Sequence, residues 1–243
     1  MSCASSLQHH EVHVWQVNLD DAVWDRFAGV LCTNEKQKAQ RYRTQSLQNR
    51  YARCRSALRM ILGQYANQAA AELHFDYGEF GKPTLPNHRL HFNVSHCGSQ
   101  GLIAVSLHEV GIDLELIAKT NVDLPGLIDL VCHPEEKRML AGLIDTQRSE
   151  MFYRLWTQKE AYCKMRGIGL QQTLSALHLE NSANPDVLQI RGESNQPASR
   201  GFIYNLDLLE DHAISACLAT DDARIATFHA GDDSSIGARP WHR

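Results

Sequence analysis

The chain has 243 residues, of which 43% are hydrophobic and 21% charged, and its formal net charge at pH 7 is −4. This composition is typical of a folded globular protein and excludes a disordered or fibrous chain. The seven cysteines include no C-x-x-C pair, which argues against a disulfide framework and a zinc finger. No apolar run approaches the length of a membrane span, and the first residues do not resemble a secretory leader, so we expect a cytoplasmic protein.

The first half of the chain predicts a strand, two helices and a hairpin. Asp20 and Asp21 cap the first helix, and the second runs through a stretch with no proline and many helix formers. The second helix could break near residues 44–47. In chain order, the expected elements are a strand at 12–19, helices at 22–31 and 34–64, and paired strands at 91–96 and 101–107.

The second half predicts a strand, then helices, then a return to strands. In the first strand, Asp113 and Glu115 share one face and the alternating apolar residues share the other. The next helical pattern restarts at HPEEK, where Pro134 suits a first turn. The expected elements are a strand at 110–117, helices within 123–145 and at 149–166, and strands at 174–180, 186–192, 201–210 and 212–220.

Strands and helices thus recur in both halves, and the small-residue strand GLIAVSLHE (101–109) is similar to HAISACLAT (212–220). We therefore expect an α+β protein with an N-terminal lobe of residues 1–109 and a C-terminal lobe of residues 110–230. Residues 231–243 are expected to form a flexible tail.

Asp113 and Glu115 lie two residues apart on a predicted strand, so their carboxylates are close enough to share one hard cation such as Mg²⁺. Alternating acidic and apolar residues also describe the solvated face of a half-buried strand. Both interpretations remain open at this point.

A row of residues four apart runs along the helix at 149–166, formed by Phe152, Trp156, Glu160 and Lys164. If its aromatic end packs in the core, its polar end should emerge at the edge of a cleft. Glu160 would then add a third carboxylate to the oxygen ligands, and Lys164 could meet a phosphate oxygen. The alternative is a Glu–Lys pair that only stabilises an exposed helix.

Basic residues gather in the predicted long helix, where an anionic partner could bind. No acid interrupts the run of Lys36, Lys38, Arg41, Arg43, Arg50, Arg53, Arg55 and Arg59. Ser95 and His96, at the end of a strand, could donate to phosphate oxygens. A solvated basic face and a structural Ser–His pair are the alternatives, and Gly81-Lys82-Pro83 is first of all a turn.

Four motifs, taken together and in this order, resemble the signature of 4′-phosphopantetheinyl transferases of the surfactin-synthetase-activator (Sfp-like) class. They are G-K-P (81–83), F-N-V-S-H (92–96), V-G-I-D-L-E (110–115) and W-T-Q-K-E-A-Y-C-K (156–164). The resemblance covers residues 80–166, and the basic helix before them agrees with it. It implies an α+β fold of two similar α/β lobes related by pseudo-twofold symmetry, with the active site in the cleft between them.

The implied reaction moves 4′-phosphopantetheine from coenzyme A to a serine of an apo acyl, peptidyl or aryl carrier protein. The products are the holo carrier protein and adenosine 3′,5′-bisphosphate. Mg²⁺, with Mn²⁺ as a substitute, would be held by Asp113, Glu115 and Glu160. Lys164 would neutralise or protonate the leaving phosphate.

The remaining roles that the resemblance implies concern coenzyme A. Ser95 and His96 would grip phosphate oxygens, and Lys82 would lie near the nucleotide. Lys38 and Arg50 would bind the 3′-phosphate, with Lys36 or Arg53 as substitutes. Among the catalytic candidates Asp113, Glu160 and Lys164, Glu160 is also the candidate base for the serine proton, although a carboxylate that ligates Mg²⁺ is a weak base.

Two other functions compete with this interpretation. A Mg²⁺-dependent nuclease or phosphohydrolase would also use acids beside a basic helix, but the pI of about 6.3 and the confined basic cluster argue against nucleic acid. The second competing function is that of an inactive module that binds coenzyme A or a carrier protein.

We expect a monomer with no membrane or nucleic-acid partner. The acidic carrier protein would dock on the basic helix or on the apolar residues of 118–133, unless these pack in the core.

Overall fold

The computed structural model describes residues 7–118, 123–169, 174–191 and 200–231, which form helices and β-sheets as the sequence predicts. The chain divides into two compact units. Within the described ranges, the first unit comprises residues 7–77, 83–107 and 224–231, and the second comprises the described residues of 78–82 and 108–223.

These bounds differ from the expected lobes of residues 1–109 and 110–230 in three segments. Residues 78–82 and 108–109 belong to the second unit, and residues 224–230 return to the first. The expected tail at 231–243 lies, beyond residue 231, outside the described residues.

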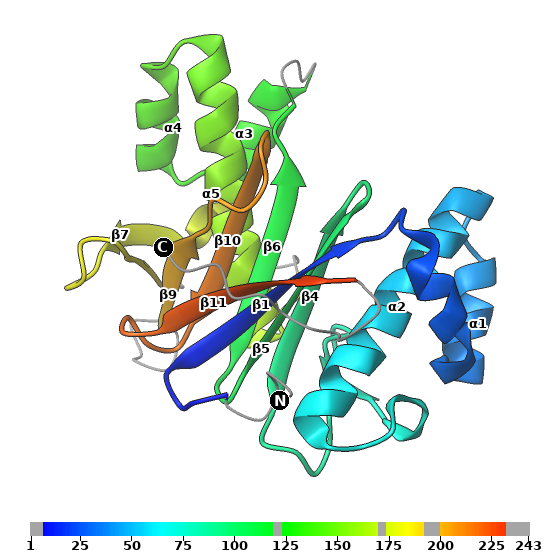
Figure 1. Ribbon diagram of the computed structural model, residues 1–243. Coiled ribbons are helices and arrows are strands. Elements are labelled where there is room, and N and C mark those ends of the chain that lie inside the picture. Colours follow the sequence, from blue (N-terminus) through cyan, green and yellow to red (C-terminus); the bar gives the residue numbers. More distant parts are fainter. Residues whose placement is uncertain (1–6, 119–122, 170–173, 192–199, 232–243) are drawn as a thin grey trace. The chain divides into compact units, whose positions relative to one another are not determined.

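The sheet of the first unit has, in the described residues, the strand order β11-β1-β5-β4. The strands are β1 (Glu11–Asn18), β4 (His91–Cys97), β5 (Gln100–Ser106) and β11 (Arg224–Ala230). β4 and β5 form the predicted hairpin, and β5 also pairs antiparallel with β1. β11, from the far end of the described chain, lies parallel to β1 on its other side (Figure 1). The sequence pattern had not indicated this last strand.

The predicted long helix of the first unit is two helices, α1 (Thr33–Gln40) and α2 (Gln45–Ala66). Thr44 begins the second, because its hydroxyl accepts a hydrogen bond from the Leu47 backbone N–H at 3.3 Å. The helix predicted at 22–31 is the 3₁₀ helix η2 (Ala22–Val30), capped by Asp21. Smaller elements are η3 (Ala70–Glu72), β2 (Asp76–Tyr77) and β3 (Pro83–Thr84).

The core of the first unit lies between α2 and the sheet. Leu58 and Ile61 of α2 are fully buried with Trp15 of β1 and Ile103 of β5. Phe228 of β11 stacks on Trp15, with ring centroids 4.9 Å apart and ring planes 25° apart. The last strand therefore supplies part of this core.

The sheet of the second unit is antiparallel, with the strand order β6-β10-β9-β8-β7 in the described residues. Its strands are β6 (Val110–Leu116), β7 (His178–Asn181), β8 (Leu188–Arg191), β9 (Arg200–Asn205) and β10 (His212–Leu218). All five overlap the predicted strands, although β7 ends one residue later and β9 begins one residue earlier than predicted. The start of the strand predicted at 174–180 is instead a 3₁₀ turn, η4 (Leu174–Ala176).

The helices of the second unit are α3 (Leu124–Val131), α4 (Pro134–Ala141) and α5 (Asp145–Arg166). α4 begins at Pro134, as predicted. Val131 of α3 is buried, and Leu124, Leu127 and Ile128 pack against the same core, so core packing is their role in this unit. In the part of the chain that the structure describes, no helix is both long and apolar enough to span a bilayer.

Candidate active site

Helix α5 lies directly on strands β6 and β10, and a glycine permits this close approach. A Cβ atom at Gly111 of β6 would overlap the Ala161 carbonyl oxygen and the Met165 backbone nitrogen of α5. Because side chains two residues apart on a strand share a face, Asp113 points toward the same helix. The V-G-I-D motif thus combines a contact residue with a candidate site residue.

Asp113 is buried, with 1% of its surface exposed, and Glu115 is partly buried. The solvated-face interpretation of the D-x-E pattern is therefore wrong for Asp113. Helix α5 covers this face of β6, so the carboxylate lies between the two elements.

Lys164 of α5 pairs with Asp113 across this interface. Its ammonium donates to Asp113 Oδ1 at 2.5 Å and lies 3.9 Å from Glu160 Oε2. Glu160 is 8% exposed, whereas the Lys164 side chain is 29% exposed. The interpretation of Glu160 and Lys164 as an exposed pair is therefore wrong for Glu160. The row of residues that begins at buried Phe152 ends, as expected, at a partly exposed residue, Lys164.

The pKa of Glu160 is raised to about 7, first by burial and next by the neighbouring Asp113 carboxylate. Lys164 lowers this pKa by less than Asp113 raises it, and Glu115 adds to the increase. The site thus holds more negative charge than one ammonium neutralises. Carboxylate oxygens are the ligands that Mg²⁺ prefers, and a divalent cation would relieve this repulsion. Asp113, Glu115 and Glu160 therefore fit such a cation in donor chemistry and in charge.

Other residues of the W-T-Q-K-E motif anchor α5 to its sheet. The Thr157 and Ser215 hydroxyls are 3.0 Å apart, and Gln158 Nε2 donates to Asn205 Oδ1 at 2.9 Å. These contacts to β10 and β9 fix how far α5 is rotated about its axis. The rotation decides which side chains of α5 meet Asp113.

Sequence reasoning missed one ion pair that supports the site. Lys159, fully buried beside Glu160, donates to Glu136 Oε2 at 2.6 Å and to the Val131 carbonyl oxygen at 2.9 Å. Glu136 also accepts a hydrogen bond from the His133 backbone N–H, at the start of α4. Lys159 thereby ties α5 to the α3–α4 turn. The only sign of this ion pair in the sequence was a lysine within a helical segment whose other residues are expected to be buried.

Lys82 also belongs to the second unit. Its ammonium donates to the Met165 carbonyl oxygen at 2.7 Å and to the Val110 carbonyl oxygen at 3.2 Å. Burial lowers the pKa of Lys82 to about 8. Lys82 of the G-K-P turn therefore links the start of β6 to the end of α5. The two carbonyl groups that it contacts belong to residues close in sequence to Asp113 and Lys164.

The basic cluster lies on two helices and not on one, and acids from outside the run pair with half of its side chains. Arg50 forms a two-point ion pair with Asp20, at 2.7 and 2.8 Å, and Arg53 forms a similar pair with Asp25. Arg55 and Arg59 both pair with buried Glu35. Charge counted along the run alone therefore overstates how many of these side chains lack an acidic partner.

The other predicted coenzyme A ligands lie in the first unit. Lys38 of α1 places its ammonium 5.6 Å from the centre of the Tyr51 ring. Ser95 and His96 are neighbours on β4, the former buried and the latter exposed. Their side chains therefore project from opposite faces of this strand.

Comparison with known proteins agrees with the motifs. Residues 109–217 match the model of the 4′-phosphopantetheinyl transferase superfamily. The chain is 36% identical over 172 residues to the 4′-phosphopantetheinyl transferase HetI of Nostoc sp.. The aligned region covers 68% of this chain and 72% of that protein.

Two further relatives extend this comparison. A putative 4′-phosphopantetheinyl transferase of Synechocystis sp. is 31% identical, over 75% of this chain and 76% of its own. The 4′-phosphopantetheinyl transferase Sfp of Bacillus subtilis is 23% identical, over 82% of this chain and 86% of its own. The matched region contains the strand and helix that bring Asp113, Glu160 and Lys164 together, and the chain belongs to the 4′-phosphopantetheinyl transferase superfamily.

Proposed function

We propose that this protein transfers the 4′-phosphopantetheine group of coenzyme A to a serine of an apo acyl or peptidyl carrier protein. One observation carries the proposal: buried Asp113 and Glu160 hold the partly exposed Lys164 ammonium between β6 and α5. In the transfer, the serine oxygen forms a bond to the phosphorus that bears the pantetheine arm. The bond from this phosphorus to the bridging oxygen breaks, and adenosine 3′,5′-bisphosphate leaves.

Lys164 is placed to neutralise the leaving phosphate. Its ammonium is held at Asp113 Oδ1 but keeps part of its surface open, so it can contact a phosphate oxygen without losing that partner. Developing charge on a leaving phosphate is stabilised most by groups that are already fixed in position. Lys164 can also supply the proton that this phosphate takes up.

Asp113, Glu115 and Glu160 would hold Mg²⁺ or Mn²⁺. When bound, the cation would neutralise charge on the pyrophosphate. Glu160 has a second candidate role, because a carboxylate with a pKa of about 7 can accept the serine proton near neutral pH. Binding of the cation would lower that pKa, so the base role and the ligand role compete.

Residues of the first unit, together with Lys82 of the second, would complete the recognition of coenzyme A. In this proposal Ser95 and His96 bind phosphate oxygens, Lys82 lies near the nucleotide, and Lys38 and Arg50 bind the 3′-phosphate. Arg50 would have to share its guanidinium with Asp20. The pseudo-twofold arrangement of two lobes, with the reaction in the cleft between them, and the monomeric state are parts of the proposal that rest on the resemblance.

The first experiment measures the intact mass of a purified apo carrier protein after incubation with this protein, coenzyme A and Mg²⁺. We expect a mass gain of one phosphopantetheine arm, no gain with Asp113→Ala, and no gain after chelation with EDTA. Coenzyme A binding without any gain, across several carrier types, would favour the binding module. No coenzyme A binding at all would favour the nuclease or phosphohydrolase.

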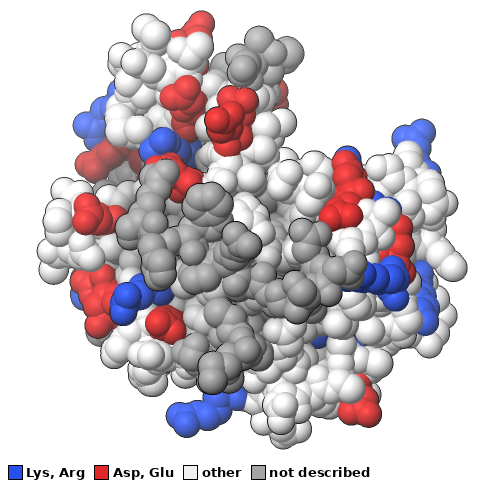
Figure 2. Space-filling view, viewed as in Figure 1, with Lys and Arg blue, Asp and Glu red and all other residues white. Residues whose placement is uncertain are grey.

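The face drawn in Figure 2 gives little support to the nuclease or phosphohydrolase alternative. Figure 2 shows one face of the molecule, on which basic and acidic side chains stand in small mixed groups. A groove for a nucleic-acid backbone would show a broader basic surface on the face that binds it.

Substitution of Glu160 separates its two candidate roles. We expect Glu160→Gln to lower the transfer rate by about 100-fold or more, the range typical of a lost general base. If Mg²⁺-dependent binding of coenzyme A persists in calorimetry, Glu160 is the base. Loss of binding together with turnover would make it a metal ligand only.

A further inference from the structure

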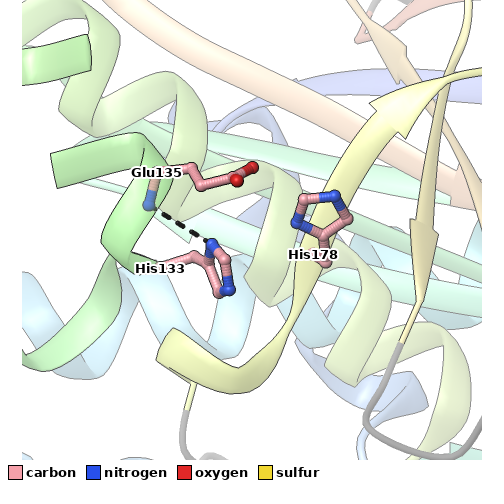
Figure 3. Close-up of side chains that lie close together, drawn as sticks. All are labelled: His133, Glu135 and His178. Atoms are coloured by element: carbon pink, nitrogen blue, oxygen red, sulfur yellow. Dashed lines mark hydrogen bonds between the residues drawn. The ribbon is translucent and has the colours of Figure 1, made fainter. Parts of the chain in front are cut away.

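A second group of metal-type ligands lies in the second unit, where α4 begins beside the edge strand β7. His133 is the N-cap of α4, Glu135 lies in its first turn, and His178 is the first residue of β7. One ligand atom from each of these side chains lies within 4.8 Å of the other two, and among the described residues this is the group of three that does so. Figure 3 shows the Glu135 side chain extending toward the His178 ring.

The donor set suits a transition metal and not Mg²⁺. Two imidazole nitrogens and one carboxylate oxygen are ligands that Zn²⁺ takes readily, and three protein ligands leave a fourth position for water. Zinc bonds of about 2.0–2.2 Å in a tetrahedron place the ligand atoms roughly 3.3–3.5 Å apart. Small rotations of the three side chains would close the observed spacing to that value.

The neighbours of the three side chains allow this closure. His133 and His178 are partly buried, and their rings meet edge to face with centroids 5.1 Å apart. Glu135 is exposed, and its contact with Arg138 at 3.6 Å joins two exposed side chains. Such a contact is worth little and is easily exchanged for a metal.

Metal binding would cost one local hydrogen bond. The Glu135 backbone N–H donates to His133 Nδ1 at 3.4 Å. Whichever ring nitrogen binds the metal, Nδ1 no longer accepts this bond, because it then holds either the metal or the ring proton. Since this bond is already long, its loss opposes binding only modestly.

We propose that His133, Glu135 and His178 bind one Zn²⁺-type ion, which links the start of α4 to the edge strand β7. The site is separate from the hard-oxygen ligands Asp113, Glu115 and Glu160. β7 is the last strand of its sheet and pairs with β8 on one side only. A metal ion at this position would therefore hold the edge strand to α4.

Calorimetric titration of Zn²⁺ into the full chain, in excess Mg²⁺, tests the proposal. We expect one Zn²⁺ per chain, an affinity at least about tenfold weaker in His178→Ala and in Glu135→Gln, and no change in Asp113→Ala. Equal binding by His178→Ala and the unaltered protein, or no binding at millimolar Zn²⁺, would overturn the proposal.

The histidine pair near the N-terminus provides the matched control. His9 and His10 are adjacent, with ring centroids 5.5 Å apart, and could bind Zn²⁺ without the site proposed here. The variant with both His9→Ala and His10→Ala should keep the full Zn²⁺ affinity. Loss of binding in this variant would place the metal at the N-terminus and contradict the proposal.

Two readouts do not depend on affinity alone. The electron paramagnetic resonance spectrum of the stoichiometric Cu²⁺ complex should show coupling to imidazole nitrogen, and this coupling should diminish in His133→Asn, where asparagine keeps a favoured N-cap residue. Excess Zn²⁺ should raise the thermal midpoint of the unaltered protein by a few degrees and leave that of folded His178→Ala unchanged. An equal rise in both proteins would contradict a site at His178.

Discussion

The Lys82 side chain shows how burial of a single charge changes stability with pH. Its pKa is about 8 in the folded protein and 10.5 in an ordinary lysine, so between these values the unfolded chain holds a proton that the folded protein has lost. Stability therefore increases as pH rises through this window. We expect the free energy of unfolding of the unaltered protein, minus that of Lys82→Met, to increase between pH 8 and 10 in urea titrations. A constant difference would show that Lys82 does not titrate in this window.

At the scale of single residues, the sequence indicated which residues belong to the candidate site better than it indicated their burial and their ion-pair partners. The four motifs located Asp113, Glu160 and Lys164, and the structure brings these three side chains together. The burial of Asp113 could not be predicted, because the helix that covers it begins more than thirty residues later in the chain. The pairing of Arg50 and Arg53 was missed for the same reason, since their acids precede the basic run.

At the scale of elements, the contact between β6 and α5 depends on Gly111. A methyl group there would overlap backbone atoms, so we expect Gly111→Ala to lower the free energy of unfolding by about 1–3 kcal/mol. The transfer rate of the variant that remains folded should also fall, because Lys164 moves away from Asp113 as the helix shifts. Gly29→Ala, where a Cβ atom meets nothing within 4 Å, is the matched control and should be nearly neutral in both assays. Equal effects of the two substitutions would contradict this account.

The buried pair of Lys159 and Glu136 fastens α5 to α4. Removal of one partner leaves the other charge buried, so we expect Lys159→Met to cost about 3–5 kcal/mol in urea unfolding. Adding Glu136→Leu should restore most of this loss, except for about 1 kcal/mol from the hydrogen bond at the start of α4. A double variant as unstable as the single one would show that packing, and not charge, is responsible.

Turn and cap residues made most elements predictable, as Pro134 illustrates at the start of α4. Thr44, which caps α2, lies in a stretch that the pattern predicted as one long helix. The exact form of the shorter helices was not predictable. Residues 22–30 have an ordinary helical pattern, yet they form a 3₁₀ helix packed against α2. Such a choice depends on tertiary contacts that a local pattern does not contain.

At the scale of the whole molecule, the first unit depends on a strand from the end of the described chain. We expect Phe228→Ala to lower the free energy of unfolding by about 3–5 kcal/mol, because the ring is buried against Trp15. His229→Ala, on the exposed face of the same strand, should change it by less than about 0.5 kcal/mol. Tryptophan fluorescence during urea unfolding measures both, and similar losses in the two variants would contradict a core role for β11.

This strand was also the main omission of the sequence-based fold. RIATFHA has modest alternation and no hairpin partner beside it, because its neighbour β1 lies at the other end of the chain. Sequence patterns identify strands best where two of them are joined by a short turn, as β4 and β5 are. A parallel pairing over most of the chain leaves no local signal.

The parallel pairing of β1 with β11 also sets an order of events on the ribosome. At 5–20 residues per second, the roughly 200 residues between these strands take about 10 to 40 seconds to synthesise. The whole second unit is made within that interval, so it can fold while β1 still lacks one neighbour. During this wait the open edge of β1 can pair with other nascent chains. Slower translation of the last third would therefore be expected to increase aggregation, and a chaperone that shields β1 would be expected to decrease it.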